Sequence, residues 1–152
     1  MYRKGASALI INTKQEFLLV NLVTFEERFF AIPGGGIEPG ETAEQAVYRE
    51  IEEELGIIKD KLELVGECKD SLCFKFKTKK LEKDGTEYEG SERYFFGFRF
   101  IGNDDDISLR ESEVRSYRWV CLEDLNKYLL FGSQLKDTSE KIVELFPFLL
   151  KN

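Results

Sequence analysis

The chain has 152 residues, 42% of them hydrophobic and 13 of them Phe, which is typical of one packed globular domain and excludes a largely disordered protein. Its formal charge of −7 favours a soluble protein and argues against a large nucleic-acid-binding surface, although it leaves room for a local basic strip. The absence of histidine excludes Ser–His and Cys–His nucleophiles and the usual nitrogen ligand of zinc, so any catalysis rests on carboxylates, Lys, Arg, Tyr or a metal.

The cysteines and the N-terminal segment indicate a reducing compartment without a membrane. Cys68, Cys73 and Cys121 are odd in number and lack C-x-x-C spacing, which is typical of reduced, packing cysteines in a cytoplasmic protein. The apolar run Ala6–Ile11 is too short for a signal peptide or a membrane span. We therefore expect a cytoplasmic protein with no membrane partner.

The first elements along the chain are predicted to be strands. Ala6–Ile11 and Phe17–Val23 are apolar, β-prone runs around a turn-like segment at 12–15, which predicts a hairpin. Phe29–Ile32 is expected to be a short strand that ends at Pro33. Gly34–Gly36 then predicts a loop whose backbone can closely approach another group.

The segment from Thr42 to Leu55 is predicted to be a helix. Thr42 and Gln45 have the spacing of a capping box, and Gly56 stands where a C-cap is expected. Apolar residues recur along the segment at four-residue intervals, at Ala43, Val47, Ile51 and Leu55.

The rest of the chain is predicted to add strands and two closing helices. The strands are Leu62–Val65, Leu72–Phe76, Arg93–Phe100 and Tyr117–Val120, and the helices are Leu122–Leu130 and Thr138–Phe146. Asp84-Gly85 predicts a turn in the polar stretch Lys77–Glu92. Several strands around one strong helix, with no linker and no repeat, predict a single α+β domain over residues 1–152.

Seven acids and one base, Arg49, lie between Glu38 and Glu54, and such a charge run usually covers a solvated helix face. At about 100° per residue, however, Glu50, Glu53 and Glu54 share a face with the small and apolar residues. The expected solvent face is instead formed by Gln45, Tyr48 and Glu52, with Glu44 at its margin. Three inward carboxylates repel one another, and a hard divalent cation, Mg²⁺ or Mn²⁺, would neutralise them because both prefer oxygen ligands.

The spacing of these residues resembles the complete Nudix box. The chain reads Gly35, five residues, Glu41, seven residues, Arg49-Glu50-Ile51, one residue, Glu53-Glu54, one residue and Gly56-Ile57. Pro33-Gly34-Gly35 and Trp119-Val120 are also similar to this family. The resemblance implies an α/β/α sandwich around a mixed sheet, flanked by helices, with the catalytic helix at about 42–55. It also implies attack of metal-activated water on a phosphorus of a nucleoside diphosphate derivative.

The resemblance further implies roles for individual residues. Glu50, Glu53 and Glu54, with Gly35 in the adjoining loop, are expected to form the metal site, and Arg49 to hold a catalytic carboxylate by an ion pair. Glu53, Glu54, Arg49 and Glu113 are the expected catalytic residues. Glu111 competes with Glu113 as the further ligand or base, and both can equally be ordinary loop acids. The expected substrate contacts are Arg3, Phe30, Gly34, Gly36 and Glu41.

Within the family, the chain is similar to the bacterial RNA pyrophosphohydrolases, which also act on dinucleoside polyphosphates. The similarity rests on Tyr2-Arg3-Lys4-Gly5, on Cys73–Lys77 and on the spacing from Glu113 to Trp119. It implies a nucleotide or a 5′-triphosphorylated RNA as the substrate. The chain departs from that branch at Gly34, at Phe30 and at Ser91–Arg93, where Gln, Trp and a Gln-rich segment are typical.

Two alternative functions remain open. A house-cleaning nucleoside triphosphate pyrophosphatase would have the same box, and a non-catalytic Nudix-fold nucleotide sensor would have the same fold without needing three placed carboxylates. Lys75, Lys77 and Lys79 would share one strand face, where they either steer phosphate or protect an exposed sheet edge. The sequence is compatible with a monomer or a homodimer.

Overall fold

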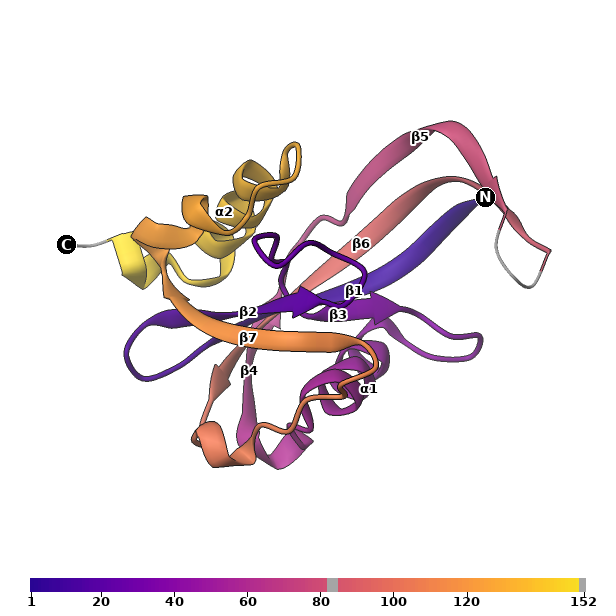
Figure 1. The fold of residues 1–152 in the computed structure, drawn as a ribbon. Coiled ribbons are helices and arrows are strands. Elements are labelled where there is room, and N and C mark those ends of the chain that lie inside the picture. The colour runs from indigo at the N-terminus through magenta and orange to yellow at the C-terminus, as the bar shows by residue number, and fades with distance from the viewer. Residues whose placement is uncertain (82–84, 151–152) are drawn as a thin grey trace.

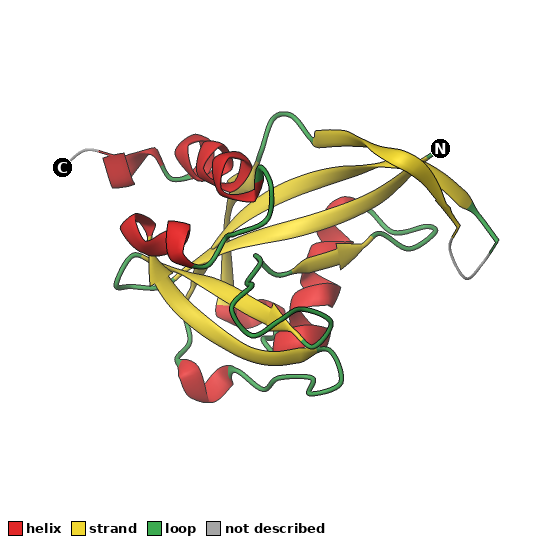
Figure 2. Cartoon of the chain, turned by 45° about the horizontal axis from the view of Figure 1, so that its top comes forward, coloured by secondary structure: helices red, strands yellow, loops and turns green. Residues whose placement is uncertain are grey.

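The computed structural model describes residues 1–81 and 85–150, in which a mixed sheet separates two helical layers (Figures 1 and 2). The strands are β1 (Tyr2–Ile11), β2 (Glu16–Leu22), β3 (Gly34–Gly36), β4 (Leu62–Glu67), β5 (Leu72–Leu81), β6 (Glu87–Phe100) and β7 (Val114–Cys121). The α-helices are α1 (Ala43–Leu55) and α2 (Gln134–Leu145), and the 3₁₀ turns are η1 (Lys59–Lys61), η2 (Asp104–Asp106), η3 (Leu122–Lys127) and η4 (Pro147–Leu150).

Over the described residues the sheet has seven strands, with β4, β6, β1, β2 and β7 side by side in that order. Strand β3 adds to β1, and strand β5 adds to β6. β1 runs parallel to β6 from the Tyr2–Gly90 pair to the Ile11–Arg99 pair, and the other pairings are antiparallel. The mixed sheet with helices on both sides confirms the predicted α+β sandwich.

Alternation along β1 divides the core between the two helices. Ala6, Ala8 and Ile10 lie in one buried cluster with the apolar residues of α1, whereas Leu9 and Ile11 lie in a second cluster with Ile142 of α2 and Phe146. Burial of a Leu or Ile side chain contributes about 1.5–3 kcal/mol. Because a one-residue slip would exchange the two sets of side chains, this packing fixes the register of β1 and so the position of β3 beside it.

Helix α1 begins and ends where the sequence predicts. The Gln45 N–H donates to Thr42 Oγ1 (3.1 Å) and the Thr42 N–H donates to the Gln45 side chain (2.9 Å), which completes the capping box. At the other end Gly56 has a φ of +68° and donates its N–H to the carbonyl of Glu52 (2.8 Å). These caps fix both ends of the helix that carries the acidic residues.

Two predictions for the segment before α1 are wrong. The described residues Phe29–Ile32 form only one isolated bridge, between Ala31 and Val20, because Asn21 holds the preceding loop through the carbonyls of Glu26 and Phe29 (2.9 and 2.7 Å). Gly34–Gly36, predicted as a loop, is strand β3. Glycine has little intrinsic preference for strands, so the pairing with β1 creates this one.

The hairpin of β5 and β6 is longer than predicted, since the polar stretch from Lys77 to Glu92 is largely strand (Figure 1). Asp84 of the predicted turn lies outside the described residues, and Gly85 has a φ of +86°. Towards the C-terminus, the predicted helix Leu122–Leu130 is only the 3₁₀ turn η3. The predicted helix Thr138–Phe146 already begins at Gln134.

The cysteines are unpaired, and the thiol of Cys68 is buried. Burial raises the pKa of Cys68 to about 12, so this thiol is protonated at neutral pH. None of the described helices is long and apolar enough to cross a membrane.

Candidate active site

The glycines of β3 lie directly against the acidic side chains of α1. A Cβ at Gly35 would lie 2.3 Å from the carboxyl carbon of Glu50, so only glycine leaves room for that carboxylate. The Gly34 N–H donates to Glu54 Oε1 at 3.2 Å. Strand β3 therefore brings open backbone to two of the three predicted metal ligands.

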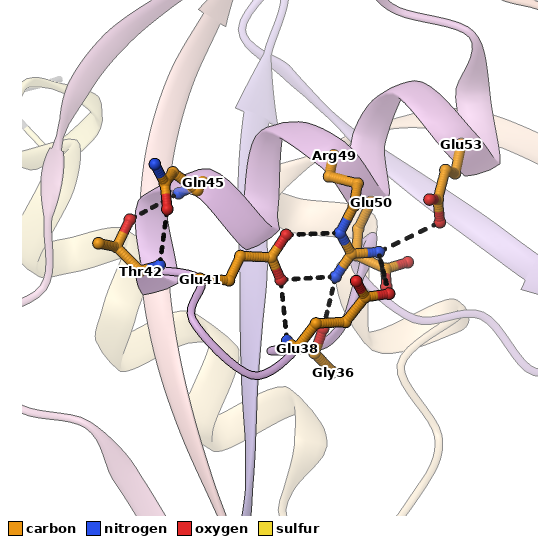
Figure 3. Close-up of polar contacts among 8 residues, drawn as sticks. All are labelled: Gly36, Glu38, Glu41, Thr42, Gln45, Arg49, Glu50 and Glu53. Atoms are coloured by element: carbon orange, nitrogen blue, oxygen red, sulfur yellow. Dashed lines mark hydrogen bonds and ion pairs between the residues drawn. The ribbon is translucent and has the colours of Figure 1, made fainter.

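Arg49 joins four acidic side chains into one network (Figure 3). Its Nε and Nη2 donate to the two oxygens of Glu41 (2.6 and 2.9 Å), and its Nη1 donates to Glu50 (3.0 Å) and Glu53 (3.2 Å). Nη1 also lies 3.6 Å from Glu38 Oε1, and Nη2 donates to the Gly36 carbonyl at 2.9 Å. Arg49, which was expected to hold a catalytic carboxylate by an ion pair, forms ion pairs with Glu50 and Glu53. Glu41, which the sequence assigned to the substrate, is the bidentate partner of Arg49.

This network holds Glu41 in its ionised form. The Arg49 hydrogen bonds, followed by the backbone N–H of Glu38, lower the pKa of Glu41 to about 2. The same contact with Glu41 raises the pKa of Arg49. The Glu41–Arg49 pair is therefore fully charged at neutral pH, and it anchors the guanidinium that holds Glu50 and Glu53.

Glu54 and Glu50 have the opposite electrostatic environment. Glu54 is buried, and burial raises its pKa to about 8, with further repulsion from Glu50 and Glu113. Burial also raises the pKa of Glu50, against the opposing effect of Arg49 and with the help of Glu53. Burial and mutual repulsion thus disfavour the ionised forms of both groups, and Arg49 does not fully offset this effect.

The face prediction for α1 is correct for Glu50 and Glu54 and wrong at two other positions. Glu53 is not buried with them: its side chain is 41% exposed and contacts Arg49 at the margin of the site. Tyr48, predicted to face solvent, packs edge-on against Phe98 (ring centroids 5.2 Å apart). Gln45, Glu44 and Glu52 are exposed as expected.

The donor set fits a hard divalent cation. Glu50, Glu53 and Glu54 supply carboxyl oxygens, and burial, followed by repulsion from Glu50, raises the pKa of Glu54, an effect that a bound cation would oppose. Within residues 1–81 and 85–150, however, no three acidic or cysteine side chains already converge closely enough to hold a metal. Glu50 and Glu53 form ion pairs with Arg49. The three carboxyl groups therefore fit a divalent cation in their chemistry, but they are not arranged as a complete coordination site.

Glu113 lies in the turn just before β7, where its carboxylate is close enough to raise the pKa of both Glu50 and Glu54. It is half-exposed and lies 3.6 Å from Arg110 Nη1. Glu111 is exposed in the adjacent turn. The electrostatic coupling with the α1 carboxylates favours Glu113 of the two candidates.

Two cavities beside β3 have three of the expected substrate contacts in their walls. A cavity of about 190 Å³ includes Arg3 and Gly36 in its wall, and a cavity of about 530 Å³ includes Gly34. Phe30 is not brought to this site: it is buried against Tyr128, with ring centroids 5.4 Å apart, and lines neither cavity.

Sequence reasoning missed Ser7 and Arg93 as site residues. The Arg93 Nη1 donates to Ser7 Oγ at 2.8 Å, and Arg93 lines both cavities. The available signals were a hydroxyl inside the apolar run Ala6–Ile11 and a charge at the start of the β-prone run Arg93–Phe100.

Strand β5 carries the three alternating lysines at the edge of the sheet. Its only partner among the described strands is β6, and Lys75, Lys77 and Lys79 are exposed. This arrangement agrees with the protection of a sheet edge.

The comparisons with known proteins agree with this geometry. The sequence pattern of the family described as NUDIX domain matches residues 1–142. A protein named RNA pyrophosphohydrolase from Pelagibacter ubique is 28% identical over 148 residues, which cover 94% of this chain and 92% of the relative. A protein of the same name from Sphingopyxis alaskensis is 29% identical over 132 residues, covering 85% and 84%. Among solved structures, the C. elegans Ap4A hydrolase binary complex superposes with a TM-score of 0.67 at 26% identity, covering 93% of this chain and 98% of that one.

Proposed function

The chain belongs to the NUDIX domain family of hydrolases, and we propose that it cleaves a phosphoanhydride bond in a dinucleoside polyphosphate or at the 5′-triphosphate end of an RNA. Hydrolases of this family generally use divalent metal ions, and Mg²⁺ or Mn²⁺ is the proposed cofactor here. The substrate class is supported by the names of the relatives, which are an RNA pyrophosphohydrolase and an Ap4A hydrolase.

The observation that carries the proposal is the Arg49 network beside the glycines of β3. A protein that only bound nucleotides would have no need for Glu50 and Glu54 to be held, partly desolvated, against open backbone. These two carboxylates repel each other and lower the stability of the fold unless a bound cation offsets their charge. The geometry therefore supports an enzyme over a nucleotide sensor.

We assign the metal to Glu50, Glu53 and Glu54. A bound divalent cation supplies a more acidic water and offsets negative charge on the departing phosphate. The protein residues do the positioning: Arg49, anchored by Glu41, fixes the orientation of Glu50 and Glu53. Glu113 is half-exposed, and its charge acts on Glu54 across a short distance. Its carboxylate is therefore the proposed acceptor of the proton lost by the attacking water.

Arg3, Gly34 and Gly36 are the proposed contacts to the substrate, since each lines one of the two cavities beside β3. The free state of all three cysteines supports a cytoplasmic location, where thiols remain reduced.

A substrate panel tests the proposed function. Purified protein is incubated with Mg²⁺ and, separately, 5′-triphosphorylated RNA, diadenosine tetraphosphate, the common nucleoside triphosphates, ADP-ribose and a nucleotide sugar, and the products are separated by ion-exchange chromatography. The proposal expects the highest kcat/KM for the RNA or the dinucleotide. A clear preference for a free triphosphate would favour the house-cleaning pyrophosphatase instead. No turnover of any compound would favour the sensor.

A further inference from the structure

One cation, Arg93, lines both cavities beside β3. It lies on β6 opposite Gly5 of β1, and a Cβ at Gly5 would lie 3.1 Å from its Nη1 and 3.2 Å from its Cζ. The guanidinium therefore lies across Gly5 and close to β3. From there it reaches the smaller cavity next to Gly36 and the larger cavity next to Gly34.

The guanidinium of Arg93 carries more hydrogen-bond donors than the described residues use. An arginine carries five N–H groups, and in the described part of the chain the one hydrogen bond from the Arg93 side chain is that to Ser7 Oγ. No fully buried side-chain nitrogen or oxygen among the described residues lacks a partner. The Arg93 side-chain nitrogens without a partner are therefore not fully buried, and Arg93 lines both cavities, where a ligand can accept from them.

The two cavities differ in chemistry. The lining of the cavity of about 190 Å³ includes four cations and two aromatic rings, and its described lining includes no acidic residue, although the chain as a whole carries a formal charge of −7. The cations are Arg3, Lys4, Lys80 and Arg93, and the rings are Phe74 and Phe76. The cavity of about 530 Å³ has mainly apolar and aromatic walls, which include Phe25, Phe95 and Phe131. The first suits phosphate groups, and the second suits the flat, apolar body of a nucleoside.

A structural role as a counterion does not account for the position of Arg93. Glu54 and Glu50 attract it electrostatically. Nevertheless, no ion pair within 4.0 Å joins Arg93 to either carboxylate among the described residues, whereas Arg49 makes such contacts with four acids. Arg93 donates to Ser7 beside the acidic site and lines both cavities.

We propose that Arg93 binds the phosphate chain of the substrate at the boundary of the two cavities, which places the nucleoside in the apolar cavity and the phosphates towards the basic one. The nucleotide substrate rests on the proposed function, but phosphate binding by Arg93 is testable without turnover. Because arginine offers a planar pair of donors to phosphate oxygens, lysine is expected to replace it only in part.

The test is calorimetric titration of inorganic tripolyphosphate into metal-free protein at low salt. Arg93→Met is expected to weaken binding at least tenfold and Arg93→Lys about threefold. Ser7→Ala, which removes the partner of Arg93 without changing charge, is expected to weaken binding by a factor of two to five. The matched control is Arg99→Met, an exposed arginine of the same strand that lies 3.6 Å from Glu63, and its affinity is expected to stay within twofold of wild type.

Tripolyphosphate affinity unchanged in Arg93→Met, or no measurable binding to the wild-type protein, would overturn the inference. Should Arg93→Met not fold, the comparison of Arg93→Lys and Ser7→Ala with Arg99→Met decides the question. Hydrolysis is measured separately with Mg²⁺ and diadenosine tetraphosphate, where Arg93→Met is expected to raise KM about tenfold and to change kcat less than threefold. A counterion role would instead lower kcat and thermal stability and leave tripolyphosphate affinity unchanged. A wild-type protein that hydrolyses nothing, yet binds tripolyphosphate through Arg93, would refute the proposed function and keep this inference.

Discussion

Replacement of Glu54 by glutamine is expected to stabilise the metal-free protein, and to do so more strongly as the pH rises. The folded protein raises the pKa of Glu54 from its ordinary value of 4.5 to about 8, chiefly through burial. Folding therefore favours the protonated acid. Between pH 4.5 and 8 the unfolded chain loses this proton and the folded chain keeps it, so the free energy of unfolding falls with rising pH and levels off above pH 8.

The size of the effect follows from that difference. A rise from 4.5 to about 8, at about 1.4 kcal/mol for each pH unit, gives an upper limit of about 5 kcal/mol. Repulsion from Glu50 is shared between the two groups, so we expect Glu54→Gln to gain roughly 2–5 kcal/mol at pH 8 and about 1 kcal/mol or less at pH 5. Glutamine keeps an oxygen to accept the Gly34 N–H, so the substitution loses little else.

The assay is urea unfolding in EDTA at several pH values from 5 to 8.5. Glu52→Gln on the exposed face of the same helix serves as the control and is expected to change stability by less than about 0.5 kcal/mol at every pH. Added Mg²⁺ is expected to stabilise the wild type and not Glu54→Gln. The gain in the free energy of unfolding of Glu54→Gln over the wild type is compared between pH 8 and pH 5. If this gain is no larger at pH 8 than at pH 5, burial does not destabilise the ionised form of Glu54 and the assignment is wrong.

Three further predictions concern the frame of the site. Gly35→Ala is expected to displace the Glu50 carboxylate, because its Cβ would lie 2.3 Å from the Glu50 carboxyl carbon, and so to lower kcat about a hundredfold. Gly66→Ala is the control in the same assay, since a Cβ there would have its nearest neighbour at an ordinary 3.6 Å. Lysine in Arg49→Lys cannot reproduce the bidentate contact with Glu41, so kcat, measured at saturating Mg²⁺, is expected to fall about tenfold or more. Gly56→Ala forces an alanine to a φ of +68° and is expected to lower the free energy of unfolding by about 1–3 kcal/mol, as measured by urea titration. An unchanged value in any of the three would contradict the corresponding contact.

The sequence predicts the catalytic helix well because its determinants are local. The capping box of Thr42 and Gln45 and the C-cap at Gly56 need only neighbours within the helix, and the structure shows both. Helical periodicity also predicts the inward position of Glu50 and Glu54. The same periodicity fails for Tyr48, because the partner that covers it, Phe98, lies on a distant strand.

Other parts of the site depend on contacts between segments far apart in the chain. Gly34–Gly36 becomes a strand only through pairing with β1, a contact that no local propensity encodes. Arg93 and Ser7 meet because β1 runs parallel to β6, and the sequence reveals neither that pairing nor the cavities beside it. Phe30, by contrast, was expected at the site, but it packs against Tyr128 away from it.

The most direct test of the central claim is the steady-state rate on the best substrate of the panel, measured with Mg²⁺ for the wild type, Glu53→Gln and Glu52→Gln. These two glutamates are adjacent on α1 and are both exposed, but only Glu53 contacts Arg49. If Glu50, Glu53 and Glu54 hold the metal, Glu53→Gln lowers kcat by at least a hundredfold and Glu52→Gln leaves it within twofold. Equal activity of the two variants, whether both are active or both inactive, would contradict that claim.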